Sequence, residues 1–479
     1  MTVLAIDQGT TSTKAFLLRD DGRLDPVGAI RHRQIHGGEG LVEHDADELI
    51  GNIETLIGEA LAKEPGIAGI AIDNQGETVV AFDRDSGRPL HNAIVWQDQR
   101  TQAWLDALAP EARERITAIC GLPVDAYFSA GKLAWLLENV DGVRALARTS
   151  RLGLATSDAF FLARLTGRYA TDITTASRTS LMDLAAGRWS DELADLFGVP
   201  VDLLPSIVPT TGPIGEARIA GRSIPVTASV VDQQAALFGH GCRRAGDLKI
   251  TFGTGTFALA LTGETPVSDR AGLVPTIAWQ LAGARPVYAL DGGDYTAAAA
   301  VEWASSVGLA GGLADFEMPA GPSALVRGHV FVPALAGLAA PHWDRAAGGA
   351  FLGLRQSTSA ADMRRAVLEG VALRAVELVE MLGGAPETAI SIDGGLTNNG
   401  YFVQFLADAL GRPVVMRGHG ELTALGAAEL GYLGLGRPVP PRDRGQDREI
   451  PPSAASEAIR AARPVFARAI AAVKMAAGG

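Results

Sequence analysis

Four short polar segments carry the residue types that phosphate binding requires, and each follows an apolar stretch of the chain. They are residues 7–12 (DQGTTS), 73–77 (DNQGE), 252–256 (FGTGT) and 393–399 (DGGLTNN). Glycine lets backbone N–H groups come close to an anion, and hydroxyl groups add hydrogen-bond donors without bulk. The Walker A pattern GxxxxGK[ST] occurs nowhere in the chain. Any one segment fits an ordinary tight turn equally well, but the four together favour two loops that hold a polyphosphate from both sides.

Two aspartates stand beside these segments at positions suited to catalysis. Asp7 ends an apolar stretch next to a candidate phosphate loop, where it can hold Mg²⁺, which uses few carboxylates and keeps its waters. Asp232 in SVVDQQAALFG stands where a predicted strand gives way to a helix, and it can accept the proton of a hydroxyl that attacks phosphorus. Each also fits a structural role, Asp7 as a turn residue and Asp232 as a helix N-cap.

Three aromatic residues, Trp96, Tyr127 and Phe257, lie beside polar turns. An aromatic face next to side chains that bind hydroxyl groups suits a polyol, which has C–H faces and O–H edges. Core packing is the alternative for each of these aromatic residues. The histidines are scattered, and their spacing indicates no set of metal ligands.

Alternating strands and helices are predicted to position these residues in the first half of the chain. Residues 2–7 and 13–20 are predicted to form a hairpin, and Asp21-Gly22 begins a second turn. A helix is predicted over 45–64, with one apolar face. Further predicted elements are strands at 66–72 and 77–83, a helix over 101–121, a connection rich in Pro, Asp and Gly over 187–225, and a strand breaking into a helix over 229–241.

The second half is predicted to repeat the opening of the first. Residues 247–263 read as strand, Gly/Thr turn and strand, as residues 2–20 do, which is by itself weak support for an internal duplication. A long helix is predicted over 361–382, and 389–411 reads as strand, glycine turn and helix. We expect an α/β fold with two domains, residues 1–240 and 241–479, and a last helix at 454–476 that can pack on either.

Composition excludes several classes of protein. The net charge is −12 over 479 residues and the isoelectric point is near 5.2, which argues against a dedicated nucleic-acid surface. Two cysteines, Cys120 and Cys242, do not make a disulfide framework. The sequence shows no signal-peptide pattern and no apolar run near the ~18 residues of a spanning helix. We therefore expect a soluble cytoplasmic protein that binds neither nucleic acid nor membrane.

Taken in order, the motifs resemble those of the FGGY carbohydrate kinases, within the sugar kinase/Hsp70/actin superfamily, over essentially the whole chain. Within that family they are most similar to the glycerol kinase branch. The segments that carry the resemblance are LAIDQGTTSTK, NAIVWQDQRT, DAYFSAGK, ATDITTASRTSL, VDQQAALFG, FGTGTF, ALAGLAAPHWD, IDGG followed by NN, and ELTALGAA. The resemblance implies two ribonuclease-H-like (actin-like ATPase) domains flanking a catalytic cleft, with Mg²⁺ and ATP on one side and a small polyol on the other. It also implies a homodimer or a higher homo-oligomer.

The same resemblance assigns roles to individual residues. Asp232 is the catalytic base and Asp7 the residue at the magnesium and phosphate position. The positions that bind ATP are Thr10, Thr11, Ser12, Lys14, Thr254, Gly395 and Asn399. The positions that bind the substrate are Gly76, Glu77, Trp96, Tyr127, Asp232, Gln233 and Phe257.

Gly76 departs from the family pattern. Glycerol kinases carry arginine between the glutamine and the glutamate of this motif, whereas this chain reads Asn74-Gln75-Gly76-Glu77. A guanidinium supplies paired donors that glycine cannot imitate, and a lost charge-assisted hydrogen bond of about 1.5–3 kcal/mol weakens binding by roughly tenfold or more. Either the pocket takes a longer acceptor, or another arginine such as Arg100 takes over. Asp294 and Tyr295 stand where the family carries apolar residues, which is compatible with substrate contacts or with packing.

The leading hypothesis is an ATP-dependent kinase that phosphorylates a primary hydroxyl of a small polyol, with glycerol as the first candidate. The alternative acceptors are a longer alditol or a ketose: erythritol, xylitol, erythrulose or xylulose. A different class is a non-catalytic, nucleotide-dependent sensor or chaperone-like ATPase of the same fold, against which the retained Asp232 and both phosphate loops argue. A dinucleotide-dependent oxidoreductase would need GxGxxG after the first strand, where the chain has DQGTTS.

Overall fold

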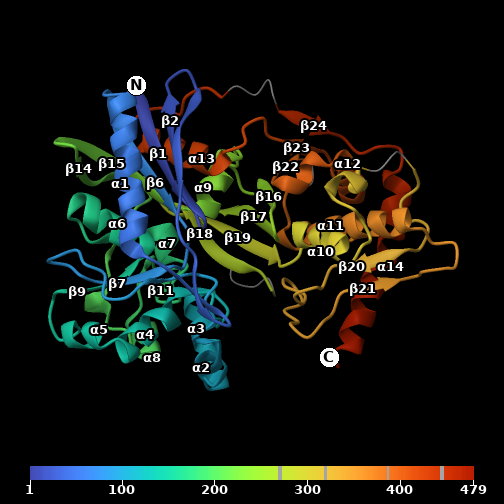
Figure 1. Ribbon diagram of the computed structural model, residues 1–479, viewed down its shortest axis with the longest axis horizontal. Helices are drawn as coiled ribbons and strands as arrows, with labels where there is room; N and C mark the ends of the chain where they lie inside the picture. Colours follow the sequence, from blue (N-terminus) through green and yellow to red (C-terminus); the bar gives the residue numbers. More distant parts are fainter. Residues whose placement is uncertain (268–271, 318–320, 386–387, 443–446, 479) are drawn as a thin grey trace.

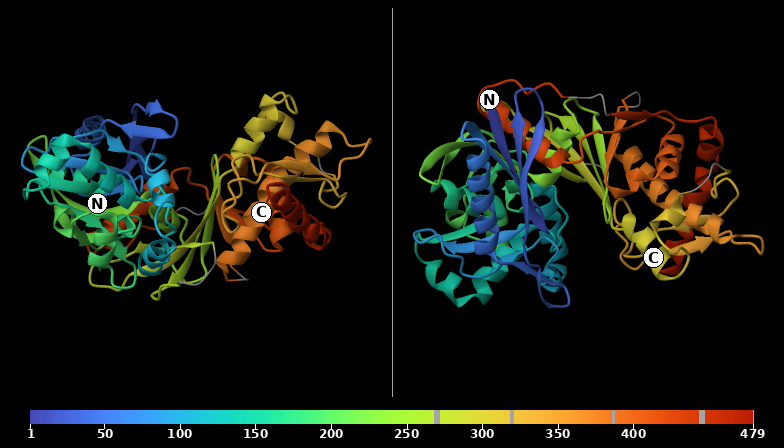
Figure 2. Two further views of the ribbon diagram at one scale, coloured as in Figure 1. Left: turned by 90° about the horizontal axis from the view of Figure 1, so that it is seen from below. Right: turned by 45° about the horizontal axis from the view of Figure 1, so that its top comes forward.

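Two lobes, each built on a mixed β-sheet with helices on its faces, make up the molecule (Figure 1). The structure is a computed structural model that describes residues 1–267, 272–317, 321–385, 388–442 and 447–478. Figure 2 shows the two lobes side by side from two further directions. In the described residues, no helix has both the length and the apolar character needed to cross a bilayer.

The first sheet has six strands among the described residues, in the order β14-β15-β6-β1-β2-β3. β1 is antiparallel to β2 and parallel to β6, and β6 is parallel to β15. The carboxyl ends of β1, β6 and β15 therefore meet at one edge of the sheet. The bounds are β1 Thr2–Gln8, β2 Ser12–Arg19, β3 Leu24–Arg31, β6 Ile67–Asn74, β14 Thr211–Ile219 and β15 Arg222–Val231.

Both faces of the first sheet are covered because side chains alternate along each strand. Leu4 and Ile6 of β1 belong to the core formed with α1 (Ala46–Lys63) and α6 (Ser157–Thr166). Val3 and Ala5 belong to the opposite core, with α9 (Asp232–Gly239) and α13 (Leu422–Gly434). α1 has the predicted apolar face, and its N-cap Asp45 accepts hydrogen bonds from the backbone N–H groups of the first turn.

A smaller sheet and a group of helices extend the first lobe below this sheet (Figure 1). The smaller sheet has the order β4-β5-β8-β7-β9 in the described residues. Its strands are β4 Ile35–Gly38, β5 Leu41–His44, β7 Val79–Asp83, β8 Ala93–Ile94 and β9 Leu152–Thr156. The remaining elements of this lobe are α2 Gln102–Asp106, α3 Pro110–Cys120, α4 Ser129–Asn139, α5 Asp141–Leu146, β10 Ala170–Asp172, α7 Ile173–Ala176, β11 Met182–Asp183, β12 Arg188–Trp189, α8 Asp191–Phe197 and β13 Ser206–Val208.

The second sheet repeats the topology of the first. Its order is β18-β19-β17-β16-β22-β23-β24 within the described ranges. β16 is antiparallel to β17 and parallel to β22, as β1 is to β2 and β6, and β22 is parallel to β23. The bounds are β16 Leu248–Phe252, β17 Thr256–Gly263, β18 Val274–Trp279, β19 Val287–Asp294, β22 Ile390–Asp393, β23 Val414–Met416 and β24 Arg448–Ile450.

Helices of the second lobe pack on this sheet and on a two-stranded hairpin. Their bounds are α10 Ala298–Ser306, α11 Ala360–Leu382, α12 Gly400–Leu410 and α14 Ser456–Ala476, and the hairpin is β20 Val330–Val332 with β21 Ala350–Leu352. α14 packs on α12, β20 and α11, so the last helix lies in the second lobe. α13 instead packs on β1, β6 and β15 of the first sheet. We propose residues 1–240 and 241–479 as the domains, with α13 as an exchanged helix that completes the first.

Two predictions about local structure are wrong. The connection predicted over 187–225 contains α8, β13 and both β14 and the start of β15. Pro213 is tolerated because β14 lies at the edge of the sheet, where a missing N–H breaks no ladder hydrogen bond. The helix predicted over 101–121 is divided into α2 and α3, because Ala109 precedes Pro110 and adopts an extended conformation.

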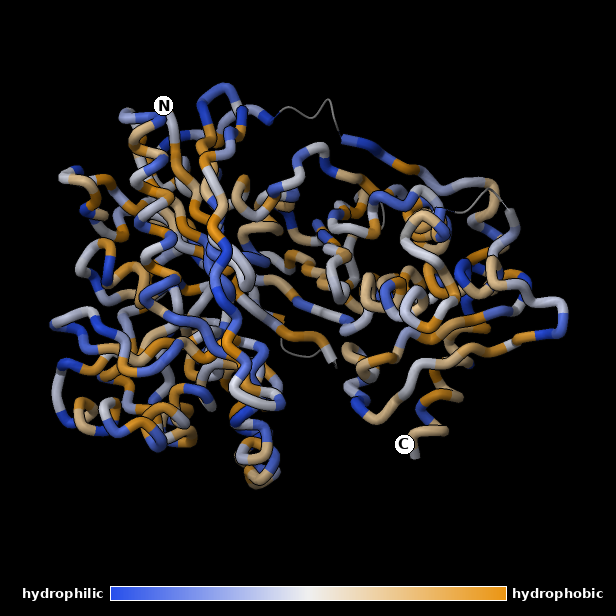
Figure 3. The backbone as a smooth tube through the Cα atoms, viewed as in Figure 1, coloured by the Kyte–Doolittle hydropathy of each residue, from blue (hydrophilic) through white to orange (hydrophobic). Residues whose placement is uncertain are grey.

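Hydropathy follows this architecture. Figure 3 shows hydrophobic segments along the strands inside both lobes and a hydrophilic turn between β2 and β3 at the top of the first lobe. The polar segments singled out in the sequence are exceptions, because they follow buried strands and stay near the junction of the lobes. Asp73, for example, is 0% exposed in β6.

Candidate active site

Three aspartates meet where the parallel strands of the first sheet end. Asp7 of β1 is paired with Asp73 of β6, and β15 ends at Val231, one residue before Asp232. In sheets of this kind ligands bind outside the carboxyl ends of the strands. The negative charges of Asp7 and Asp232 both raise the pKa of Asp73, after burial, the largest cause. The sequence pointed to Asp7 and Asp232 but gave Asp73 no role of its own.

The loop between β1 and β2 has the predicted form of a tight hairpin tip. Gly9 donates its N–H to the Ser12 carbonyl oxygen at 3.1 Å, and Thr11 is exposed. Thr10 is held from outside the loop, because Trp96 Nε1 donates to Thr10 Oγ1 at 3.0 Å. Lys14 reaches Glu421, just before α13, at 2.8 Å. The loop is therefore braced by Trp96 on one side and by the exchanged helix on the other.

The loop between β16 and β17 is the counterpart in the second sheet. Thr254 is exposed at its tip. A side chain at Gly255 would put its Cβ 2.5 Å from the Asp294 carbonyl oxygen, so the close approach of two backbones requires glycine there. Both hairpin tips thus present hydroxyl groups, and the second tip has a backbone that a side chain at position 255 would not allow.

Gly395 and Asn399 lie beyond the end of β22. Gly395 is exposed and a Cβ there would meet only open space. Asn399 is the N-cap of α12, where its Oδ1 accepts from Phe402 N–H at 2.9 Å and its Nδ2 donates to the Phe316 carbonyl oxygen at 2.7 Å. Asn399 therefore shapes the start of α12, next to the exposed Gly395.

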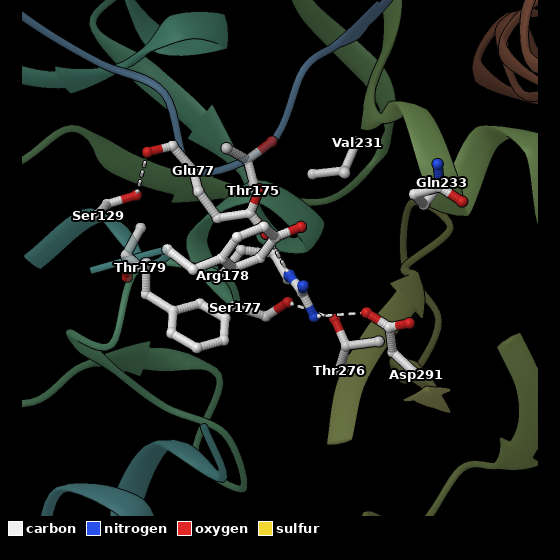
Figure 4. A network of polar contacts seen from close by, with 12 residues as sticks. Glu77, Ser129, Thr175, Ser177, Arg178, Thr179, Val231, Gln233, Thr276 and Asp291 are labelled. Atoms are coloured by element: carbon white, nitrogen blue, oxygen red, sulfur yellow. Dashed lines mark hydrogen bonds and ion pairs between the residues drawn. The ribbon is translucent and has the colours of Figure 1, made fainter. Parts of the chain in front are cut away.

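The candidate acceptor-binding residues surround an arginine to which the sequence assigned no role. Arg178 Nε donates to Glu77 Oε1 at 2.6 Å, and Arg178 NH1 lies 3.2 Å from Asp291 Oδ2 of β19. Figure 4 shows the guanidinium between the two carboxylates. Burial lowers the pKa of Arg178, but Glu77 and Asp291 outweigh burial and raise it, so the guanidinium stays charged.

Arg178 is the guanidinium that the structure places beside Glu77. Arg100, the suggested replacement, is committed elsewhere, because its NH2 lies 2.6 Å from Glu43 and 2.8 Å from Asp98 and its guanidinium covers Trp135. Arg178 belongs to the segment ATDITTASRTSL, directly after α7. A single basic residue within the buried, hydroxyl-rich run 170–182 is the sequence signal that could have identified it.

The backbone around Gly76 is tightly confined. A Cβ at Gly76 would lie 3.2 Å from Val231 Cγ1, so part of the room left by the glycine is already filled. Glu77 adopts a left-handed conformation with φ of 60°, and Ser129 Oγ donates to its carbonyl oxygen at 3.1 Å (Figure 4). A non-glycine residue in this region of φ is strained and persists only when its surroundings hold it.

The predicted aromatic and amide residues surround the same network. Tyr127 packs edge-on against Trp96 with ring centroids 5.6 Å apart, and the Arg178 guanidinium lies 5.7 Å from the Tyr127 ring. Lys132, fully buried, donates to the carbonyl oxygens of Ala126, Tyr127 and Phe128 and so fixes the backbone of the aromatic segment.

The second lobe also contributes residues to this polar network. Phe257 of β17 is paired with Gly293 of β19, two residues from Asp291 on the same face of the sheet. Lys249 Nζ donates to Gln233 Oε1 at 2.5 Å, which fixes which end of the amide remains available to a ligand. The predicted substrate residues Gly76, Glu77, Trp96, Tyr127, Gln233 and Phe257 therefore lie around Arg178 and Asp291.

Asp294 and Tyr295 have structural surroundings. Asp294 is 2% exposed and lies 3.4 Å from Arg374 NH2 in the second lobe. Tyr295 packs under the guanidinium of Arg345 at 4.2 Å. Their contacts favour the packing alternative, and Asp291, three residues earlier, is the carboxylate that faces the pocket.

The surroundings of Asp232 tune its carboxyl group. Burial, followed by the charge of Glu77, raises the pKa of Asp232 to about 7. Its Oδ1 accepts a hydrogen bond from Gln233 N–H at 2.7 Å. A general base works best with a pKa near the operating pH, so this carboxylate between the acceptor pocket and the hairpin loops is suited to receive a proton.

The fold and the candidate site together define a class of protein. Two sheets of the same actin-like topology each carry a hairpin loop with hydroxyl side chains. The loops lie beside a candidate base and a network of polar residues. Comparison with known proteins agrees. Sequence models of the N-terminal and C-terminal domains of the FGGY family of carbohydrate kinases match residues 2–239 and 248–435. The chain therefore belongs to the FGGY family of carbohydrate kinases, which are ATP-dependent.

Individual relatives show which members of the family this chain is similar to. A glycerol kinase of Trichlorobacter lovleyi is 42% identical over 447 residues, which is 91% of this chain and 90% of the relative. A glycerol kinase of Thermus brockianus is also 42% identical over 446 residues, 91% of this chain and 90% of that protein. Among solved structures, the glycerol kinase of Plasmodium falciparum with ADP is 28% identical with a TM-score of 0.89, covering 98% of each chain.

Proposed function

We propose that this protein transfers the γ-phosphoryl group of ATP to a primary hydroxyl of a small polyol, with glycerol as the first candidate. The observation that carries the proposal is Asp232, a carboxylate with a pKa of about 7 between the acceptor pocket and the phosphate loop. The names of the relatives that match most of the chain support glycerol.

The acceptor is held by groups of opposite hydrogen-bonding character. Glu77 and Asp291 accept hydrogen bonds from hydroxyl groups, while Arg178 donates to hydroxyl oxygens. The aromatic faces of Trp96 and Tyr127 cover the C–H surface of the polyol. Two carboxylates around one guanidinium disfavour an anionic acceptor, so the pocket suits a neutral polyhydroxyl compound.

The chemistry requires positioning and charge neutralisation more than covalent catalysis. Asp232 takes the proton from the attacking hydroxyl, and Gln233, oriented by Lys249, holds the acceptor beside it. Thr10, Thr11, Ser12 and Lys14 on one side and Thr254 on the other hold the phosphate chain, with Gly395 and Asn399 at the adenosine.

Asp7 is the proposed magnesium residue, and its surroundings fit a hard cation. Its neighbour Asp73 has two buried carboxylate oxygens that accept no hydrogen bond from any donor in the described part of the chain, and carboxylate oxygen is a ligand that Mg²⁺ prefers. Bound Mg²⁺ supplies charge neutralisation on the polyphosphate.

A longer alditol or a ketose is the second candidate for the acceptor, since Gly76 leaves out the side chain that its family position carries. The test is ADP release with Mg-ATP against glycerol, erythritol, threitol, xylitol, ribitol, erythrulose, xylulose and ribulose, each at low and high concentration. Turnover that depends on one of these acceptors supports a kinase, and the preferred one names the substrate. ATP hydrolysis indifferent to every acceptor would refute the proposal and favour an ATPase-type sensor.

A further inference from the structure

Asp73 and Asp7 form a carboxylate pair at the end of the first sheet. They are Cα partners on the adjacent parallel strands β6 and β1, so their side chains project from the same face. Asp73 is 0% exposed, and both of its carboxylate oxygens lack a hydrogen-bond donor among the described residues.

The protein supplies little positive charge to this pair. The cation that acts on both carboxylates is Lys14, whose ammonium group is already paired with Glu421 at 2.8 Å. Asp232 adds a further negative charge that acts on Asp73. A buried charge without a partner is costly enough that a protein neutralises it with a proton, an opposite charge or a metal ion.

The corresponding pair in the second sheet is neutralised by the protein itself. There Thr251 takes the place of Asp7, and Asp393 takes the place of Asp73, again as Cα partners on parallel strands. His240 lies 3.4 Å from Asp393, and the charge of the buried Lys249 acts on the same carboxylate. The first sheet has Ala5 where the second has Lys249, two residues before the paired position.

We propose that Asp73 and Asp7 together form a divalent-cation site, in which Asp73 is a second carboxylate, and that the protein takes up the cation before any nucleotide is present. Side chains on the same face of adjacent parallel strands can reach one cation together, and Mg²⁺ is usually held by one or two carboxylates at about 2.0–2.1 Å. No group of three His, Cys, Asp or Glu side chains in the described ranges converges on an ion. A site with two carboxylates and several waters agrees with that finding and with the usual coordination of Mg²⁺.

The proposal rests on the proposed kinase function only for its purpose, since cation uptake can be measured without turnover. The competing explanation is that Asp73 is a neutral carboxylic acid that only orients Asp7 by donating a hydrogen bond. Asparagine has the same shape and can donate that bond, so Asp73→Asn preserves an orienting role and removes a metal ligand.

The experiment measures Mn²⁺ binding to the nucleotide-free protein by electron paramagnetic resonance, with competition by Mg²⁺. We expect one Mn²⁺ per chain in the wild type, an affinity at least tenfold weaker in Asp73→Asn, and an unchanged affinity in Asp393→Asn, the matched position of the second sheet. Near- and far-ultraviolet circular dichroism checks that each variant is folded. If Asp73→Asn does not fold, the wild-type melting temperature still decides, since Mg²⁺ alone must raise it.

Equal Mn²⁺ affinity of the wild type and Asp73→Asn would overturn the proposal, as would an absence of Mn²⁺ binding or of Mg²⁺ stabilisation in the wild type. Acceptor-dependent turnover in the same preparation separates this result from the fate of the kinase proposal. If the wild type turns over an acceptor and Asp73→Asn binds Mn²⁺ as tightly as the wild type, only the proposed cation site is refuted. If Mn²⁺ binding depends on Asp73 but the wild type turns over none of the acceptors, only the proposed kinase function is refuted.

Discussion

At the carboxyl end of the first sheet β1 and β6 place Asp7 beside Asp73, whereas the matching strands β16 and β22 of the second place Thr251 beside Asp393. Burial raises the pKa of Asp393, but the hydrogen bond and charge from His240 and the charge of Lys249 outweigh it and bring it to about 2. Burial and neighbouring carboxylates instead raise the pKa of Asp73. One strand topology thus gives an electrically balanced end, suited to support the adenosine, and an acidic end, suited to a cation and a general base.

The substitution with the largest expected effect tests whether the carboxyl ends of the two sheets have different functions. Asp232→Ala removes the proposed base at the first end, so we expect kcat to fall by about 10²–10⁴-fold while ADP affinity stays within about twofold of the wild type. We expect Asp393→Ala, at the second end, to weaken ADP binding, because Asp393 leads directly into the loop that we propose holds the adenosine. Steady-state kinetics with calorimetric ADP titration measures both. Full activity of Asp232→Ala would remove its assignment as the base.

Arg178 contacts Glu77 in the first lobe and Asp291 in the second. Replacing Arg178 tests how much the stability of the protein depends on these two contacts. Arg178→Ala leaves Glu77 and Asp291 as buried carboxylates without their cation, so the free energy of unfolding falls by about 3–5 kcal/mol. Urea denaturation measures this loss. The control is Arg115→Ala, which breaks an exposed pair with Glu192 and changes stability by less than about 1 kcal/mol. Equal losses in the two variants would contradict a special role for Arg178.

An arginine at position 76, at the carboxyl end of the first sheet, is expected to change the preference among acceptors by a smaller factor. Gly76→Arg fills the room beside Glu77 and pushes against Val231 Cγ1, which lies 3.2 Å from the Cβ position. We expect xylitol and erythritol to lose about tenfold in kcat/KM relative to glycerol, the usual range for a changed pocket volume. An unchanged ratio would show that position 76 does not set acceptor length.

The smallest expected effect is a dependence of kcat on pH. It arises from the carboxyl end of the first sheet and has no counterpart at the second. Asp232 acts as a base when deprotonated, and its raised pKa of about 7 means that protonation begins just below neutrality. We expect kcat to fall about twofold from pH 8 to pH 7 and about tenfold per unit well below pH 7. ADP affinity stays flat from pH 6 to 8, because Asp393 titrates near 2. A kcat independent of pH between 6 and 8 would contradict the assignment of Asp232.

The sequence predicted the strand–loop–strand units well because their signals are local. Glycine and threonine between apolar strands specify the tips at 9–12 and 253–256, and the apolar face of residues 46–63 specifies a helix. β14 was missed because Pro213 and the glycines beside it indicate a loop, and only its place at the sheet edge makes a strand possible there.

Motifs identified most of the candidate site, but they did not identify which groups neutralise each other. The partner of Glu77 is Arg178, 101 residues away, and the second partner of that arginine is Asp291 in the other lobe. Arg100 is nearer in sequence, yet Asp98 and Glu43 already hold it. Pairings over such separations follow from how the lobes meet, and no pattern within one segment records that.

The exchanged helix α13 has a consequence for how the protein is made. The face of the first sheet that carries Val3, Ala5 and Phe16 is covered by α13, and Tyr432 of that helix donates hydrogen bonds to the carbonyl oxygens of Met1 and Leu18. On the ribosome these early strands wait for roughly 400 further residues, or about 20–80 seconds at usual rates of synthesis. During that interval the nascent chain carries an uncovered apolar surface, which is prone to aggregation until α13 is made.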